Sequence, residues 1–185
     1  ARDSTDNRTS IVDAGGIVPL LALLESTSQK AMENAASALT QLCATRANQD
    51  AIAEAGGIQL LVNVLTKSSS NVKETSAISL CSLAACAIWE LSKNHTANQL
   101  AAAEAGAINP LVAMLGSPQA EMQSNAAGAL STLASNNHDN QTAIARTGAI
   151  APLCTLVREG SSETKEQSAS ALWSLAHENA PNKAT

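Results

Sequence analysis

The protein has 185 residues, of which 45% are hydrophobic, and a formal net charge of −5. This length and apolar content suit one globular domain, and the mild negative charge argues against a nucleic-acid or anionic-membrane partner. The aromatic residues are two Trp, so small aliphatic side chains must form the core, which favours closely packed helices over a β-sandwich.

Three landmarks recur along the chain at a period near 42 residues. The first is a segment that reads IVDAGGIVPLLALL from Ile11, IAEAGGIQLLVNVL from Ile52, AAEAGAINPLVAML from Ala102 and IARTGAIAPLCTLV from Ile144. Its first glycines step by 41, 50 and 42 residues, at Gly15, Gly56, Gly106 and Gly148. The second is an alanine-rich motif that begins at Ala35, Ala84, Ala126 and Ser168, and the third is an asparagine at Asn48, Asn98, Asn140 and Asn182. Self-similarity at a fixed period indicates a repeat architecture, here with one enlarged unit.

Each unit is predicted to form three helices. A short first helix begins at the asparagine, a good N-cap, and ends at the glycine, which tolerates positive φ. A second helix follows at once, and a Ser/Gly-rich loop leads to a third helix that carries the alanine-rich motif on one apolar face. The predicted helices lie near 48–55, 58–66, 98–105, 108–116, 121–135, 140–147, 150–158 and 163–177. No unit can bury its apolar face alone, so the stacked units form a solenoid.

The second unit carries about eight extra residues, which are predicted to enlarge its third helix to residues 71–94. One apolar stripe crosses this segment without a break, which predicts a single helix about two turns longer than its neighbours. Its overhanging part carries Ile78, Cys81 and Leu83 beside serines. This apolar patch is read either as local repacking or as a contact with a partner protein.

The pattern resembles the armadillo repeat family through an A-G-G/A-I turn, then P-L-V-x-L-L and A-A-x-A-L-x-x-L. The resemblance covers nearly the whole chain and implies an all-α fold, a right-handed α-solenoid of about four armadillo repeats with three helices each. Residues 1–185 are then a single domain. Its repeats lie at approximately 1–47, 48–97, 98–139 and 140–181, and residues 182–185 begin a further repeat.

The resemblance also implies that the third helices line a concave groove, which holds extended segments of partner proteins. Importin-alpha-like members grip their ligand with a Trp and, four residues later, an Asn on each third helix. In this chain the Trp position falls on Ser37, Cys86, Gly128 and Ser170, and the Asn position falls on Gln41, Glu90, Thr132 and Ser174. Because no repeat matches, nuclear-import-signal binding is not expected, whereas a more general hydrogen-bonding grip stays open.

The expected partner-binding residues combine the groove with the patch on the enlarged helix. Trp89 and Trp173 occupy equivalent places in their repeats, and are read either as packing between third helices or as aromatic anchors on the groove wall. The full set is Ser37, Gln41, Cys86, Glu90, Trp89, Thr132, Ser170, Ser174, Trp173, Ile78 and Leu83.

The chain shows no motif for catalysis, a metal or a cofactor. Four cysteines lie in apolar helical stretches without a CxxC pair, which indicates reduced, buried thiols (Cys43, Cys81, Cys86 and Cys154). His95, His138 and His177 follow successive third helices, about 8–10 Å apart, too far to share one metal ion, and are predicted to be surface residues.

We therefore expect a non-enzymatic scaffold that binds other proteins or extended peptide segments, without a cofactor, through the groove or the enlarged helix 71–94. It is also a candidate subunit of a larger assembly. The alternative is a regulatory or targeting domain of a larger protein whose enzyme part lies outside these residues. An N-terminus without a signal-peptide pattern and the lack of a long apolar run favour an intracellular, cytoplasmic protein that does not insert into a membrane.

Overall fold

The computed structural model describes residues 2–69, 75–177 and 179 of the chain. These residues form helices and no strand, which confirms the predicted all-α class. The helices are α1 Arg2–Asp13, α2 Ile17–Leu23, α3 Gln29–Leu42, α4 Arg46–Glu54, α5 Gly57–Ser69, α6 Thr75–Ser92, α7 Thr96–Glu104, α8 Ile108–Met114, α9 Ala120–Ala134, α10 His138–Arg146, α11 Ile150–Glu159 and α12 Ser162–Ala176.

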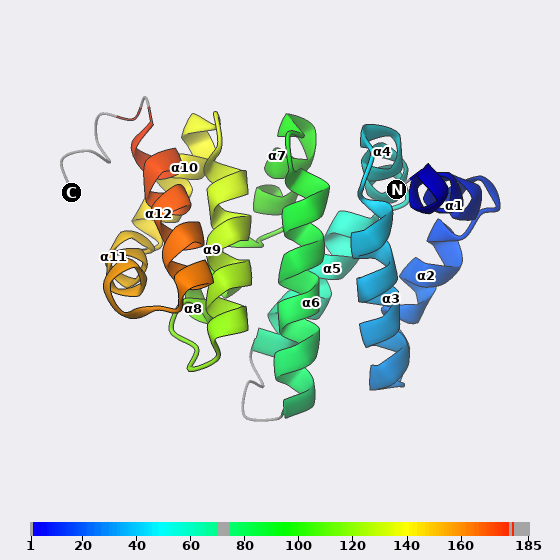
Figure 1. Ribbon diagram of the computed structural model, residues 1–185, viewed down its shortest axis with the longest axis horizontal. Coiled ribbons are helices and arrows are strands. Elements are labelled where there is room, and N and C mark those ends of the chain that lie inside the picture. The colour runs from blue at the N-terminus through cyan, green and yellow to red at the C-terminus, as the bar shows by residue number, and fades with distance from the viewer. Residues whose placement is uncertain (1, 70–74, 178, 180–185) are drawn as a thin grey trace.

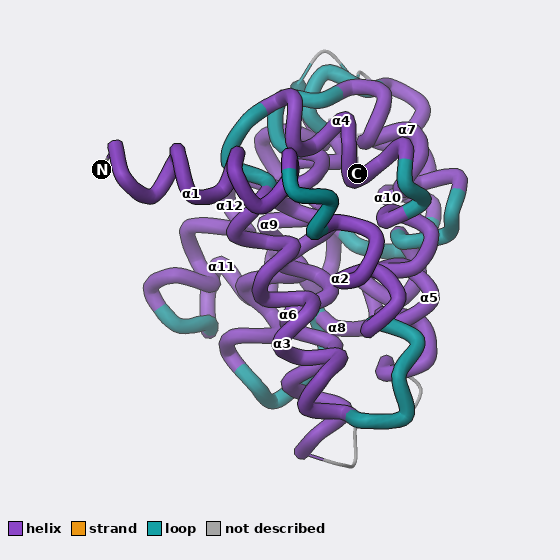
Figure 2. Tube along the Cα trace, turned by 90° about the vertical axis from the view of Figure 1, so that its right-hand side faces the viewer, coloured by secondary structure: helices purple, strands orange, loops and turns teal. Residues whose placement is uncertain are grey.

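The helices form four repeats of three, stacked along the long axis of the molecule (Figure 1). The third helices, α3, α6, α9 and α12, lie side by side across one face, and the second helices α5 and α8 lie behind them. Viewed end-on, the repeats lie behind one another, with α1 projecting to one side (Figure 2). Buried aliphatic residues form one hydrophobic cluster from Ile17 to Leu175, as the solenoid interpretation requires.

The predicted glycine turns are confirmed. Gly15, Gly56, Gly106 and Gly148 have φ values of 78°, 82°, 92° and 87°. This left-handed conformation is unfavourable for any residue with a Cβ atom. It lets each second helix begin at once, in a new direction.

The predicted starts of the first helices are wrong by two residues. The N-caps are Thr45, His95 and Asn137, whose side chains accept the backbone N–H three residues later. The three repeated asparagines that the structure describes, Asn48, Asn98 and Asn140, lie inside these helices and are buried. The Nδ2 of each donates to the carbonyl of the preceding third helix, from Asn48 to Leu42, Asn98 to Leu91 and Asn140 to Leu133, at 2.8, 2.8 and 2.9 Å. The asparagine therefore joins successive repeats rather than capping a helix.

The enlarged repeat has a long third helix. Within the described residues, helix α6 has 18 residues, against 14 in α3 and 15 in α9. Its partner α5 runs to Ser69, beyond the predicted end near residue 66. The predicted helical start at 71–74 lies outside the described residues. Within the described residues, the second helix of this repeat is also longer than its counterparts, with 13 residues in α5 against 7 in α2, 7 in α8 and 10 in α11.

Candidate functional site

The face formed by the four third helices carries the predicted groove positions in two parallel rows. Ser37 and Gln41 on α3 are exposed, whereas Cys86 and Glu90 on α6 are half-buried. On α9, Thr132 is half-buried and Gly128 is buried. On α12, Ser170 is exposed, but Ser174 is only 3% exposed. The face is therefore most accessible to a ligand over α3 and α6.

The surface is hollowed between α3 and α6. A depression of about 300 Å³ is lined by Arg8, Thr40, Gln41, Ala44, Cys86 and Glu90. A second of about 520 Å³ follows toward the C-terminal ends of the two helices, where Lys93 and Asn94 join Cys43 and Glu90 in its wall. Gln41 and Glu90, predicted from repeat position alone, thus lie on the same depression.

Charged side chains line this hollow on both sides. The guanidinium of Arg8 donates to Oε1 of Gln41 at 3.4 Å, and Lys93 pairs with Glu90 at 3.7 Å. Burial raises the pKa of the Cys86 thiol, and the carboxylates of Glu90 and Glu121 raise it further. Two acidic groups therefore approach Cys86, and one basic group lies at either side.

Sequence reasoning missed Arg8 and Glu121. Arg8 stands at the place that Gln49, Gln99 and Gln141 take in the later repeats. This replacement of a repeated glutamine by an arginine was visible in the sequence and could have marked Arg8 as a residue of the site. Glu121 had no such signal, because its approach to Cys86 depends on how α9 packs beside α6.

The two Trp residues have different surroundings although their repeat positions are equivalent. The Trp89 ring lies on Gly128 of the next third helix, where an added Cβ would come within 2.7 Å of ring carbons. At the junction between the third and fourth repeats, Ser131 takes the place of Trp89 and Ser170 takes the place of Gly128. Ser131 Oγ lies 2.9 Å from Ser170 Oγ and 3.2 Å from Ser174 Oγ. Trp173 is 62% exposed and stacks on His177 with ring centroids 4.8 Å apart.

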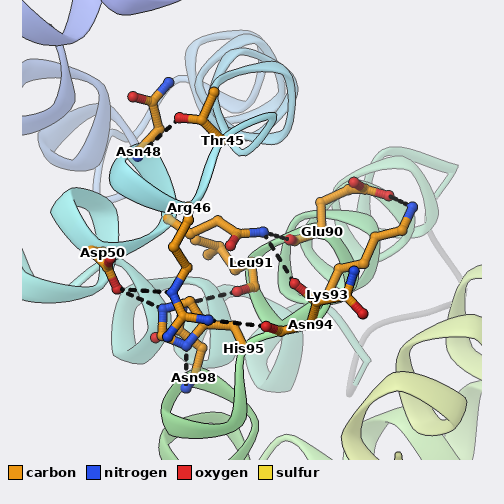
Figure 3. Close-up of polar contacts among 11 residues, drawn as sticks. Thr45, Arg46, Asn48, Asp50, Glu90, Leu91, Lys93, Asn94, His95 and Asn98 are labelled. Atoms are coloured by element: carbon orange, nitrogen blue, oxygen red, sulfur yellow. Dashed lines mark hydrogen bonds and ion pairs between the residues drawn. The ribbon is translucent and has the colours of Figure 1, made fainter.

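The junction between the second and third repeats is held by a polar cluster (Figure 3). His95 is only 3% exposed, so the expectation that all three histidines are surface residues is wrong for this one. Its Nδ1 accepts the N–H of Asn98 at 3.3 Å, which leaves Nε2 to donate to Asp50 Oδ1 at 2.6 Å. Arg46 pairs with Asp50 and donates to the carbonyl oxygen of Asn94. The imidazole therefore replaces the cap that Thr45 and Asn137 supply elsewhere.

The start of α6 does not present the open apolar patch that the sequence predicted. Cys81 and Ser82 are buried, and Ile78 and Leu83 are half-buried against the core. Ser82 donates to Glu121 on α9 at 3.0 Å, because α9 packs against this side of the helix. Ile78 lines a cavity of about 230 Å³ together with Ser69, Ala113, Met114, Gly116, Ser117, Pro118, Gln119 and Met122.

The cysteines are free thiols, with Cys43 and Cys81 buried and Cys86 and Cys154 half-buried. Among the residues that the structure describes, no group of three or more His, Cys, Asp or Glu side chains is placed to hold a metal ion. Nor is any helix in this part of the chain long and apolar enough to cross a membrane.

Comparisons with known structures return the same architecture. An engineered protein solved by a structural genomics consortium superposes with a TM-score of 0.84 at 31% identity, over 93% of this chain and 67% of that one. A designed armadillo repeat protein superposes with a TM-score of 0.85 at 25% identity, over 96% of this chain and 72% of that one. A structure described as computationally designed armadillo repeat proteins for modular peptide recognition superposes with a TM-score of 0.83 at 26% identity, over 97% of this chain and 72% of that one. No curated protein matches the chain.

The sequence itself matches a known repeat family in three segments, residues 4–44, 95–135 and 137–177. Residues 45–94, which include the enlarged helix α6, lie outside the match. The matched segments make up more than half of the chain and coincide with repeats that carry the glycine turn and the alanine-rich third helix. The chain belongs to the family described as Armadillo/beta-catenin-like repeat.

Proposed function

We propose that this chain is a non-enzymatic binding module that holds an extended segment of a partner protein against its row of third helices. The observation that carries the proposal is the hollow between α3 and α6, where Gln41 and Glu90 stand at equivalent positions of successive repeats. Support comes from the similar designed armadillo proteins, which were made for modular peptide recognition.

An extended peptide needs partners for backbone groups that no sheet neighbour satisfies. The amide of Gln41 supplies both a donor and an acceptor, and the carboxylate of Glu90 accepts a backbone N–H. Neighbouring helices lie about 8–10 Å apart, while an extended chain rises about 3.4 Å per residue, so a ligand advances between two and three residues per repeat. Side chains of the ligand can then enter the hollow at regular intervals.

The two halves of the face are proposed to contribute unequally. Gln41 is exposed, whereas Ser174 is buried and its hydroxyl lies beside that of Ser131. A buried hydroxyl with a protein partner gains little from a new ligand, because the existing hydrogen bond has to be broken first. The predicted grip therefore concentrates on α3 and α6, with Thr132 beyond them.

A random 12-residue peptide library displayed on phage is the probe that tests this function. Peptides enriched on the protein should lose about tenfold or more in affinity when Gln41→Ala and Glu90→Ala are combined, because two hydrogen bonds of about 1 kcal/mol each are lost. Gln59→Ala with Asn63→Ala is the matched control, since these side chains hydrogen-bond to each other on α5, a second helix. Equal affinity of wild type and the groove variant, or no enrichment above an uncoated surface, contradicts the proposal.

A further inference from the structure

The hollow between α3 and α6 is lined mainly by basic charges. Arg8 lines the first depression, and Arg46 and Lys93 line the second. Glu90 lines both. Among the described residues of this lining, three basic side chains and one acidic side chain give a formal charge of +2, whereas the whole chain carries −5. The sign of the charge in the hollow is therefore opposite to that of the protein.

The cations at the second depression remain open to solvent. Arg46 pairs with Asp50 at 3.6 Å, and the same carboxylate oxygen lies 2.6 Å from the buried His95 ring (Figure 3). Lys93 pairs with Glu90 at 3.7 Å. The side chains of Arg46 and Lys93 nevertheless keep 57% and 55% of their surface exposed. Pairs of this kind are weak in water, so a ligand can approach both cations.

The carbonyl groups at the end of α6 are already bound. A helix C-terminus presents unpaired carbonyl oxygens, which would repel a ligand carboxylate. Here Nε2 of Gln49 donates to the carbonyl oxygens of Glu90 and Lys93 at 2.8 and 3.4 Å. Arg46 donates to the carbonyl oxygen of Asn94 at 2.9 Å. This end of the hollow therefore offers a ligand positive charge and N–H donors more than free carbonyl groups.

The repeat fold does not require these cations. The positions of Arg46 and Lys93 hold no Arg or Lys in any other repeat. Their counterparts are Thr5, Thr96 and His138 for Arg46, and Ala44, Ser135 and His177 for Lys93. Three helices form in each of those repeats without a cation at either place. The basic charges therefore belong to this one junction and not to the repeat as such.

We propose that the segment held between α3 and α6 is acidic, and that its Asp or Glu side chains lie over the basic rim formed by Arg8, Arg46 and Lys93. This inference rests on the proposed function, because it assigns the chemistry of the ligand that the hollow holds. An exposed ion pair changes affinity only a few-fold, and salt screens it. The rim therefore selects among extended segments, while the contacts to the ligand backbone hold any of them.

The phage-displayed library that tests peptide binding also tests this inference, through the composition of the enriched peptides. Asp and Glu should rise about twofold or more above their frequency in the unselected library, and Lys and Arg should fall below theirs. Enrichment that requires Gln41 and Glu90 but shows no excess of Asp and Glu overturns the acidic assignment and leaves the proposed function standing. An excess of Lys and Arg does the same. No enrichment at all removes both.

Fluorescence anisotropy with the most enriched peptide then locates the charges that it meets. Arg46→Gln combined with Lys93→Gln should weaken binding about three- to tenfold at low salt, and less at roughly 0.5 M NaCl. Arg8 is left intact, because it contacts Gln41 of the proposed backbone grip. Lys67→Gln with Arg146→Gln is the matched control, since it removes the same charge from exposed sites that line neither depression.

A neutral form of the same peptide, with Asn and Gln in place of Asp and Glu, separates local pairing from a general effect of charge. It should bind the wild type and the Arg46/Lys93 variant with equal affinity. Circular dichroism of each variant shows that a loss of binding is not a loss of folding. Equal losses in the Arg46/Lys93 and control variants overturn the proposal, and so does an undiminished loss with the neutral peptide.

Discussion

Replacing Gly128 by Ala tests the packing of Trp89 between the second and third repeats. Taken by itself, Gly→Ala inside a helix stabilises by about 0.5–1 kcal/mol, because glycine loses more backbone entropy on folding. Here the new Cβ meets the Trp89 ring at 2.7 Å, so the ring has to move. Overpacking of this kind costs about 1–3 kcal/mol. The free energy of unfolding should therefore fall by up to about 2 kcal/mol.

The double variant separates the two effects. Trp89→Ala should cost about 2 kcal/mol, less than a fully buried Trp, because the ring is half-buried. In the Trp89→Ala background the clash is absent, so Gly128→Ala should now stabilise by about 0.5–1 kcal/mol. The sign of the same substitution thus reverses, and the coupling between the two sites should be about 1–3 kcal/mol.

Urea unfolding followed by circular dichroism at 222 nm measures all four proteins. Ser37 supplies the control, because it occupies the equivalent site on α3 and is exposed. Ser37→Ala should be more stable than Ser37→Gly by about 1 kcal/mol, the helix propensity alone. If Gly128→Ala stabilises equally with and without Trp89, the ring does not restrict this site and the packing described above is wrong.

Three further predictions concern the turns, the histidine cap and the thiols. Gly56→Ala should lower the free energy of unfolding in urea by about 1–2 kcal/mol, because a φ of 82° strains an alanine although the space around its Cβ is open. An unchanged free energy would show that the turn relaxes. His95→Ala should cost about 1–2 kcal/mol and His95→Asn less, since Asn137 caps α10 in the same way; equal losses would exclude the capping role. Burial, with smaller effects of Glu90 and Cys86, raises the pKa of the Cys43 thiol from 9.0 to about 12, and burial raises that of Cys81 to about 11. In the unfolded chain these thiols ionise at a lower pH than in the folded protein, so the stability that they contribute is present below pH 9 and is lost as the pH rises towards 12. The free energy of unfolding of Cys43→Val should therefore fall less between pH 8 and 10.5 than that of the wild type. An identical fall in both proteins would refute this.

Features that depend on neighbours in sequence were predictable. The four glycine turns follow from local backbone conformation, and the three-helix unit follows from apolar periodicity and turn residues. Repetition strengthened each local signal, because four noisy copies of one pattern agree on a period. The family resemblance and the all-α solenoid therefore followed from the printed sequence, and both are confirmed.

Features that depend on contacts between repeats could not be predicted from the sequence. The repeated asparagine looked like a helix cap. At Asn48, Asn98 and Asn140, however, its amide donates to a carbonyl of the preceding repeat, and the cap lies three residues earlier. His95 is buried where two repeats meet, and its ring lies within hydrogen-bond distance of Asp50, 45 residues away in sequence. The apolar start of α6 looked exposed, and packing by α9 covers part of it.

The two Trp residues show the division most clearly. Sequence alone placed them at one position of the repeat and left open whether they pack or bind. The structure lays Trp89 on a glycine of the next helix and leaves Trp173 exposed, although the local sequence around each has the same pattern. Periodicity fixes which face of a helix a residue occupies. Whether that face is covered depends on side chains about 40 residues away, so only the tertiary structure decided it.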